Sequence, residues 1–269
     1  MPHLQSIRIY PIKSTAGLQL EHCTVQARGL CGDRRMMLVD QQGRFVTGRT
    51  HPALTAIRCQ RHGDGWRVTA PGKSPLVLHS DSDAETRIQV TVWADQVSAR
   101  AFSEEVDQWF SDVLQQPVRL ASMDAQSERP IEPGFGQSGD QVSFADGYPL
   151  LLISRAAVEE LNRHLSTPVK MANFRPNLVV SDCSAHAEDQ WHRIRIGEVE
   201  FDLVKPCSRC VFTTVDPERH QKRTDGEPLR TLVQYRRREG KVMFGQNIIA
   251  RGAGRICAGD EVEVLDASN

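Results

Sequence analysis

Residues 205–217 read Lys205-Pro-Cys-Ser-Arg-Cys-Val-Phe-Thr-Thr-Val-Asp-Pro and contain the closely spaced cysteine pair of the chain, Cys207 and Cys210. Free cysteine is most often a small buried apolar side chain, so two buried thiols at the end of a strand are the simplest interpretation. A structural zinc site needs four ligands, and the sequence offers no second C-x-x-C and no nearby pair of suitably spaced histidines. A thioredoxin-like pair would begin a helix, whereas residues 211–215 are β-branched and aromatic and favour a strand.

A fourth interpretation is that one thiolate of this stretch binds a soft transition metal. Arg209 and Lys205 are its neighbours in sequence, and positive neighbours favour the ionised thiol. If the metal came within an anionic organic cofactor, the chain would also need phosphate partners, for which the available residues are Lys13, Ser14, Arg34, Arg175 and Asn177. Each of these side chains taken alone is more often a solvated surface group, and sequence alone does not bring them together.

Outward from this stretch, the sequence predicts two halves that are mostly β with a few helices (α+β). Short apolar runs separated by Gly, Asp and Pro are typical of the strands of a barrel or sandwich. We expect strands over residues 4–11, 36–40, 45–47, 56–59, 65–69, 75–79, 148–153, 177–180, 194–196, 199–204, 210–215 and 261–265. Helices are expected over 103–115, from a cap at Ser154 onward, and over 229–238. Residues 121–145, rich in Ser, Asp, Gln, Gly and Pro, predict a linker or mobile loop, so we divide the chain into domains 1–120 and 121–269.

Composition excludes several functional classes. The 269 residues include 33 Lys+Arg and 34 Asp+Glu, and this balance gives no general attraction to nucleic acid. No run of about 18 apolar residues predicts a membrane span, and the N-terminus lacks the apolar segment of a secretory signal. Seven cysteines, an odd number spread over a long chain, favour reduced thiols over a disulfide framework. We therefore expect a cytoplasmic protein that binds neither a nucleic-acid polymer nor a membrane.

Nine short motifs, in the same order along the chain, resemble those of the MOSC proteins that carry an N-terminal MOSC-type β-barrel domain. That family includes the mitochondrial amidoxime-reducing components and their bacterial relatives. The matching motifs begin at Tyr10 (YPIKS), Gly32 (GDR), Phe45 (FVTGR), Asp146 (DGYP), Asn173 (NFRPN), Glu188 (EDQW), Lys205 (KPCSRCVFTTVDP), Gly226 (GEPLRTL) and Phe244 (FGQN). The resemblance covers essentially the whole chain and implies an N-terminal MOSC-type β-barrel followed by a MOSC β-barrel domain.

The resemblance implies a molybdenum-cofactor (Mo-molybdopterin) oxidoreductase that reduces N-hydroxylated compounds, namely hydroxylamines, amidoximes and N-hydroxylated nucleobases. Cys210 matches the family's molybdenum ligand and catalytic position, whereas Cys207 matches a position that does not bind the metal. The remaining matches imply contacts with the pterin, its phosphate or the loop around the metal, and they fall on Lys13, Ser14, Arg34, Arg175, Asn177, Ser208 and Arg209. The family is also associated with pyridoxal phosphate binding and with detoxification of N-hydroxylated bases.

The expected partners are an N-hydroxylated small molecule and an electron-transfer protein. Some bacterial relatives carry a fused ferredoxin, but no C-x4-C-x2-C pattern occurs in this sequence. We therefore expect electrons from a separate flavin reductase, flavodoxin-like or ferredoxin-like protein. The alternative to an enzyme is a carrier of molybdenum cofactor or sulfur, because MOSC domains also resemble the C-terminal domain of molybdenum-cofactor sulfurases.

A basic run lies between Arg219 and Lys241, with eight Lys and Arg residues against three acidic ones. A charge run of this kind is more often a solvated surface. The functional alternative is a docking face for an acidic electron donor, since a local basic patch accelerates encounter. This alternative places Arg236, Arg237 and Arg238 on the exposed face.

Overall fold

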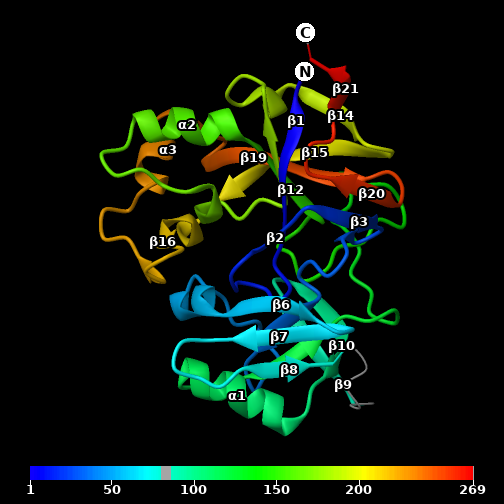
Figure 1. Ribbon diagram of the computed structural model, residues 1–269, viewed down its shortest axis with the longest axis vertical. Helices are drawn as coiled ribbons and strands as arrows, with labels where there is room; N and C mark the ends of the chain where they lie inside the picture. Colours follow the sequence, from blue (N-terminus) through cyan, green and yellow to red (C-terminus); the bar gives the residue numbers. More distant parts are fainter. Residues whose placement is uncertain (80–85, 269) are drawn as a thin grey trace.

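The computed structural model describes residues 1–79 and 86–268, which form a larger and a smaller lobe stacked along the long axis of the molecule (Figure 1). Both chain ends lie on the larger lobe, and the smaller lobe contains β6 to β10 and the helix α1. Strands make up 42% of the chain and helices 16%, so the prediction of a mostly β chain with a few helices is confirmed.

A nine-stranded sheet forms most of the larger lobe. Its order is β2 (Leu18–Leu20), β1 (His3–Ile9), β13 (Leu178–Ser181), β12 (Leu150–Ser154), β19 (Lys241–Ala250), β15 (Val199–Arg209), β14 (Trp191–Ile196) and β21 (Val262–Ala267), and β18 (Arg237–Arg238) also pairs with β19. The first strand of the chain is antiparallel to β13, with Ile7 opposite Leu178. A second sheet of three strands pairs β20 (Gly254–Cys257) with β3 (His22–Gln26), which pairs with β4 (Gly29–Leu30). The first 30 residues therefore lie among strands of the second half of the sequence.

The smaller lobe contains two antiparallel sheets and α1. One sheet has the order β5 (Met36–Val39), β11 (Arg119–Ser122), β10 (Asp95–Ala101) and β9 (Arg87–Val92). The other has the order β6 (Arg58–His62), β7 (Gly65–Thr69) and β8 (Leu76–Leu78). Helix α1 (Glu104–Leu114) begins where the sequence predicts, because the Ser103 hydroxyl accepts a hydrogen bond from the Val106 amide. The domain division after residue 120 stays a prediction.

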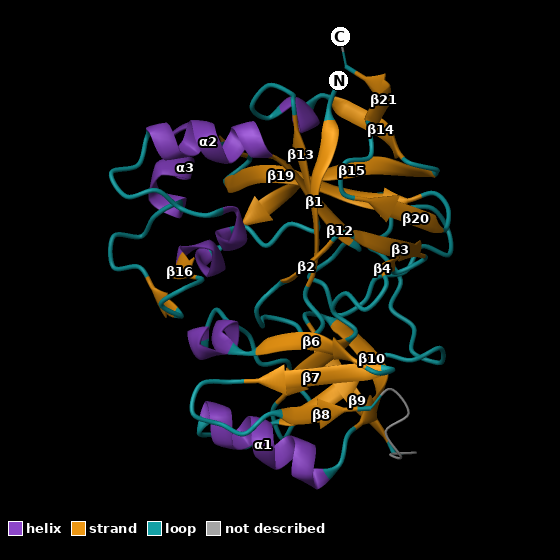
Figure 2. Cartoon of the chain, in the orientation of Figure 1, coloured by secondary structure: helices purple, strands orange, loops and turns teal. Residues whose placement is uncertain are grey.

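Helices α2 (Arg155–Arg163) and α3 (Leu229–Tyr235) lie together on one side of the larger lobe (Figure 2). Ser154 occupies the N-cap position of α2, but its hydroxyl caps no amide of that helix and instead accepts from the His186 amide. The remaining elements are short 3₁₀ turns and one strand pair: η1 (Pro52–Ala56), η2 (Met171–Asn173), η3 (Ala187–Asp189), η4 (Val211–Thr214), and β16 (Val215–Asp216) with β17 (Gln221–Lys222).

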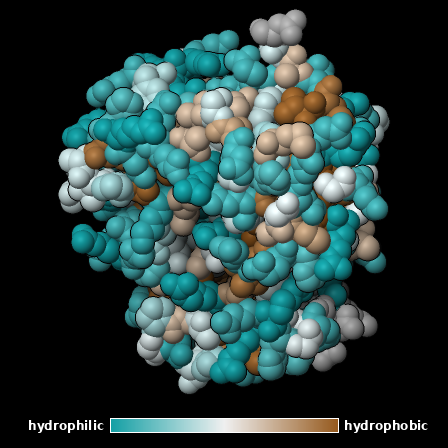
Figure 3. Space-filling model, turned by 45° about the horizontal axis from the view of Figure 1, so that its top comes forward, coloured by the Kyte–Doolittle hydropathy of each residue, from teal (hydrophilic) through white to brown (hydrophobic). Residues whose placement is uncertain are grey.

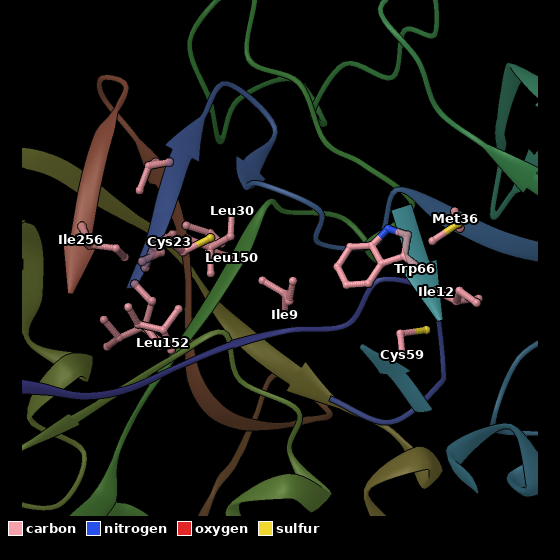
Figure 4. Close-up of a cluster of buried hydrophobic side chains, with 14 of the residues drawn as sticks. Ile9, Ile12, Cys23, Leu30, Met36, Cys59, Trp66, Leu150, Leu152 and Ile256 are labelled. Carbon is pink, nitrogen blue, oxygen red and sulfur yellow. The ribbon is translucent and has the colours of Figure 1, made fainter. Parts of the chain in front are cut away.

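The hydrophobic core is continuous from one lobe into the other. One cluster contains Ile9, Leu150 and Leu152 of the large sheet and extends to Cys59 and Trp66 of the smaller lobe (Figure 4). Because apolar packing of this density transmits displacement, we infer that the two lobes move little relative to each other.

Two strand predictions are wrong. The predicted strand 210–215 instead contains the 3₁₀ turn η4, because the hydroxyls of Thr213 and Thr214 donate to the carbonyls of Cys210 and Val211, three residues back. Such local bonds offer the backbone an alternative to a strand ladder. Residues 45–47 make only an isolated bridge, between Phe45 and Val39.

The segment predicted as a linker, 121–145, connects the lobes but makes fixed contacts. Its Ile131, Val142 and Ala145 are buried with Ile249 of β19.

The face in Figure 3 is largely hydrophilic, and no helix within the described residues is long and apolar enough to cross a membrane.

Candidate functional site

A cavity of about 1020 Å³ lies where loops of both lobes meet. Every residue predicted for the site lines it: Lys13, Ser14, Arg34, Arg175, Asn177, Ser208, Arg209 and Cys210. The sequence positions come from the loop after β1, the loop before β5, the segment before β13 and the end of β15. The fold therefore brings together residues that lie up to 197 positions apart in the sequence, from Lys13 to Cys210.

The cavity is strongly positive, although the whole chain is nearly neutral. Eight Lys and Arg side chains line it against four Asp and Glu side chains, whereas the formal net charge of the chain is −1. A concave surface with such an excess concentrates anions.

Cys210 presents a free thiol to this cavity. It follows the last residue of β15, precedes the turn η4, and is exposed. Its sulfur has no polar partner in the described part of the chain. Cys207 differs, because it is partly buried and its sulfur accepts a hydrogen bond of 3.0 Å from Arg209 Nη1. The thiol available to an added ligand is therefore that of Cys210.

Two arginines of the site stack on the ring of Tyr10. The guanidinium groups of Arg34 and Arg175 lie 4.4 and 4.1 Å from the ring centroid. Tyr10 is buried, and its hydroxyl donates to the Pro176 carbonyl over 3.1 Å. Cation–π contacts of this kind orient the cations and fix their position.

The two arginines differ in their hydrogen bonds. Arg34 donates through Nη1 to Asp33 over 2.7 Å and to Asn177 over 2.9 Å, and through Nη2 to the Arg175 carbonyl over 3.2 Å. Among the described residues, Arg175 donates only through Nη1, to the Thr15 carbonyl over 2.7 Å, and its buried Nη2 has no partner. Burial lowers the pKa of Arg175 to about 10. Arg34 is thus fixed by the protein, while Arg175 keeps unused donors.

A second donor without a partner in the part of the chain that the structure describes is Nε of Arg209. The same guanidinium is fixed by bonds from Nη1 to Cys207 and from Nη2 to the Phe174 carbonyl over 2.5 Å. Buried polar groups normally have hydrogen-bond partners, so unpaired donors of Arg175 and Arg209 in one cavity point to an absent ligand with acceptor atoms.

Lys13 and Asp146 form an ion pair within the cavity, with Lys13 Nζ 2.5 Å from Asp146 Oδ1. Lys13 Nζ also donates to the Phe144 carbonyl over 2.7 Å. Burial lowers the pKa of Lys13 to about 8 in spite of the opposing effect of Asp146. The pKa of Asp146 lies well below its ordinary value, because Lys13, Arg49 and Arg34 together outweigh the opposite effect of burial.

Backbone strain is concentrated around the cavity. Nine non-glycine residues in the described chain have positive φ, and five of them line the cavity: Ser14, Arg34, Trp93, Arg175 and Glu239. A left-handed backbone is uncommon for such residues and clusters at ligand-binding positions. The strain therefore agrees with a ligand site at this place.

Asn177 and Ser208 are placed differently from the arginines. The Asn177 side chain is buried and used within the protein, since it accepts from Arg34 and from the Leu151 amide and donates to the Arg8 carbonyl. Ser208 is exposed and has no hydroxyl hydrogen bond in the described chain. Asn177 therefore positions Arg34, and Ser208 is free to contact a ligand.

Sequence reasoning missed several lining residues. Asp146 lies in a quoted motif, but its pairing with Lys13 was not predicted. Arg129 is buried and donates to the carbonyls of Ser143, Ala145 and Asp146, which fixes the segment that carries Asp146. Trp93 belongs to none of the motifs, and nothing in its sequence context indicated a cavity position.

The exposed basic face requires one correction. Arg236 is buried and donates through Nη2 to Asp189 over 2.6 Å and through Nε to the Met243 carbonyl. It cannot meet a partner, because its charge is already paired below the surface. Arg237, Arg238 and Lys241 are exposed at the hairpin of β18 and β19.

Two family models match the chain. The MOSC N-terminal beta barrel domain matches residues 1–117, and the MOSC domain matches residues 139–263. The human mitochondrial amidoxime-reducing component 1 is 34% identical over 275 residues, covering 96% of this chain and 81% of that protein.

Other relatives are similar at a comparable level. The bovine mitochondrial amidoxime reducing component 2 is 34% identical over 238 residues, covering 85% of this chain and 70% of that protein. The molybdenum cofactor sulfurase of rice (Oryza sativa subsp. japonica) is 30% identical over 266 residues, but the match covers 32% of that protein. With its two MOSC-type domains, this chain belongs to the same family as the mitochondrial amidoxime-reducing components.

Proposed function

We propose that this chain is a molybdenum-cofactor oxidoreductase that reduces N-hydroxylated compounds: hydroxylamines, amidoximes or N-hydroxylated nucleobases. The observation that carries the proposal is the combination, in one positive cavity, of the free Cys210 thiol with unpaired donors on Arg175 and Arg209. Relatives named as amidoxime-reducing components support the same reaction class.

The residues present fit a cofactor that joins a phosphate to a metal. Cys210 would hold the metal, because an ionised thiol is a strong ligand for soft metals. Arg175 and Lys13 would hold the phosphate by charge-assisted hydrogen bonds, and Arg34, whose guanidinium bonds are made within the protein, would add its positive charge. Ser14, Ser208 and Arg209 would contact the remaining polar edge of the pterin, and Asn177 would keep Arg34 in place.

When bound, molybdenum would supply the two-electron chemistry that cleaves an N–O bond. The overall change is that R–NHOH, two electrons and two protons give R–NH₂ and water. The protein's part is to hold the cofactor and the substrate in the cavity. The Lys13–Asp146 pair keeps an exchangeable proton next to the cavity, and Arg129 fixes the segment on which Asp146 lies.

The test is turnover by protein produced in a molybdenum-replete host, with reduced viologen as donor and hydroxylamine, benzamidoxime and N-hydroxyadenine as substrates. We expect close to one molybdenum per chain and reduction of at least one substrate. Cys210→Ser, with Cys207→Ser as matched control, assigns the turnover to this cavity. Molybdenum-loaded protein that reduces none of the three would refute the proposal.

The second candidate is a carrier of molybdenum cofactor or sulfur, favoured by the similarity to the rice sulfurase. A carrier would bind the cofactor in the same cavity and release it to an acceptor protein without turnover. The viologen assay separates the two candidates. Neither the family models nor the relatives named above point to pyridoxal phosphate, and the proposal does not include it.

Electrons would come from a separate flavin reductase, flavodoxin-like or ferredoxin-like protein. We propose that an acidic donor of this kind approaches the exposed Arg237 and Arg238. Donor-dependent turnover should then fall with rising salt, as steering is screened over roughly 8 Å at physiological ionic strength. Arg237→Gln/Arg238→Gln should reproduce the salt effect while viologen-dependent turnover stays unchanged; indifference to both would place the docking face elsewhere. A cytoplasmic location and a role in detoxification also stay predictions, and the amidoxime-reducing components named above are described as mitochondrial.

A further inference from the structure

Trp93 is an unusual residue at its position in the fold. Only Trp93 and Ala94 connect β9 to β10, whose residues Val92 and Asp95 are paired. Trp93 has a φ of 58°, in the left-handed region where glycine, asparagine or aspartate is ordinarily found in a two-residue hairpin turn. A bulky residue held in this conformation is a reason to look for a function.

The side chain of Trp93 lines the cavity and is 50% exposed. Two groups pack against the indole: the Arg49 guanidinium, 4.3 Å from the ring centroid, and the Phe45 ring, at 5.1 Å. Arg49 in turn lies 5.5 Å from the Phe45 ring. If Arg49 and Phe45 lay on opposite faces of the indole, the distance between them would be nearly twice the observed 5.5 Å. The two groups therefore do not enclose the ring between them, and they leave one face uncovered.

The uncovered face suits a flat ligand. Arg49 makes no side-chain hydrogen bond or ion pair in the described chain. Its positive charge therefore interacts with the rings of Phe45 and Trp93 and with the adjacent cavity. The same Arg49 charge contributes to the low pKa of Asp146, which pairs with Lys13. Trp93 therefore stands at the cavity into which the charged groups of the site project.

Resting on the proposed function, we propose that Trp93 is a specificity-determining residue whose free face stacks on substrates that carry the N–OH group on a flat aromatic ring. Stacking of a base on an aromatic side chain is tolerant of ring identity, because every base has a π-face. Trp93 would thus favour aromatic N-hydroxylated compounds over aliphatic ones and over free hydroxylamine, without contacting the N–O bond.

The kinetic test compares N-hydroxyadenine with hydroxylamine, which has no ring, in molybdenum-loaded protein with reduced viologen. For N-hydroxyadenine, Trp93→Ala should raise KM between about fivefold and a hundredfold, with kcat little changed. KM for hydroxylamine should stay the same, and Trp93→Phe should restore most of the affinity for the base. Val77→Ala is the matched control, since Val77 is an exposed side chain of the same lobe that does not line the cavity.

A binding test does not need turnover. Adenine is titrated into cofactor-free protein while tryptophan fluorescence is recorded, and the other three tryptophans are more buried than Trp93. Stacking on Trp93 should quench a part of the emission that is absent from Trp93→Phe. Thermal unfolding of each variant checks that the fold is retained.

The outcomes separate this inference from the proposed function. If Trp93→Ala raises both KM values equally, or if Trp93→Phe quenches like the wild type, then Trp93 only supports Arg49 and the inference is overturned. If the wild type reduces neither of these compounds nor benzamidoxime, the proposed function fails, and the fluorescence titration alone decides whether Trp93 stacks on flat rings.

Discussion

Replacing Arg34 and Arg175 by methionine should have opposite consequences for stability and ligand retention, although both arginines stack on Tyr10. Methionine keeps an unbranched apolar stem of similar length and removes the charge and all donors. Arg34→Met breaks the pair with Asp33, whose side chain is only 1% exposed, and also the bonds to Asn177 and to the Arg175 carbonyl. Leaving one member of a buried ion pair alone costs about 3–5 kcal/mol.

Arg175→Met removes one hydrogen bond, to Thr15, and a guanidinium that has no ion-pair partner in the described chain. Because burial already disfavours this charge, as its lowered pKa records, the lost bond is partly offset and we expect a loss below about 1.5 kcal/mol. At roughly 2–4 °C per kcal/mol, Arg34→Met should lower Tm by about 6–20 °C and Arg175→Met by less than about 6 °C.

The order of the two variants should be reversed for ligand retention, with the larger loss in Arg175→Met. An anion held by Arg175 would lose a charged hydrogen bond of about 1.5–3 kcal/mol, which is a tenfold to hundredfold weaker affinity. The assays are thermal unfolding of cofactor-free protein and molybdenum per folded chain after purification. The reasoning is refuted if Arg175→Met unfolds as readily as Arg34→Met while its molybdenum content per folded chain is normal.

Three further predictions concern the same cavity. Cys210→Ser should abolish molybdenum retention and turnover, since a hydroxyl is a poor ligand for a soft metal, whereas Cys207→Ser should keep most of both; equal loss would indicate a paired-cysteine site. Gly48→Ala should displace the loop of Cys210, because a Cβ at position 48 would lie 2.3 Å from the Phe212 ring. The molybdenum content should fall in this variant, and the double variant Gly48→Ala/Phe212→Ala should regain it in a double-mutant cycle. Sulfate should bind cofactor-free protein less tightly as pH rises through about 8, because Lys13 loses its proton there while the charge of sulfate is constant above pH 6. In isothermal titration, Lys13→Arg should remove this pH dependence. Because the pKa of Lys13 is lowered on folding, the same group should make stability rise between about pH 8 and 10.5, so weaker sulfate binding over that range cannot be attributed to unfolding.

The parts of the fold that the sequence predicted are those governed by local signals. Ser103 followed by acidic residues and an apolar face identified α1 almost to the residue. The strand predicted after Cys210 failed because the back-bonding of Thr213 and Thr214 competes with β propensity, and sequence pattern does not reveal which of the two prevails.

The candidate site was predictable as a set of residues but not as an arrangement. Motif resemblance named Lys13, Arg34 and Arg175 together, whereas the different roles of the two arginines depend on the bonds of Arg34 to Asp33 and Asn177. Asp33 is its neighbour in sequence, but only the fold brings Asn177, 143 positions away, beside Arg34. Arg236 and its neighbours are alike in sequence, yet Arg236 is buried and donates to Asp189, 47 positions away, whereas Arg238 stays exposed at 3.8 Å from the same carboxylate. The role inferred for Trp93 depends on its positive φ, which no residue pattern in the sequence predicts.

The pairing of β1 with β13 has a consequence for biosynthesis. Ile7 meets Leu178 only after 171 further residues have been added, and at 5–20 residues per second that takes roughly 10–30 s. During this interval β1 is a nascent strand without its final neighbour, and the loop with Lys13 and Ser14 that follows it cannot adopt its final place. We therefore expect the nascent chain to need protection of β1 by a chaperone, and we expect cofactor insertion to come after translation has passed β21, once the whole sheet has closed.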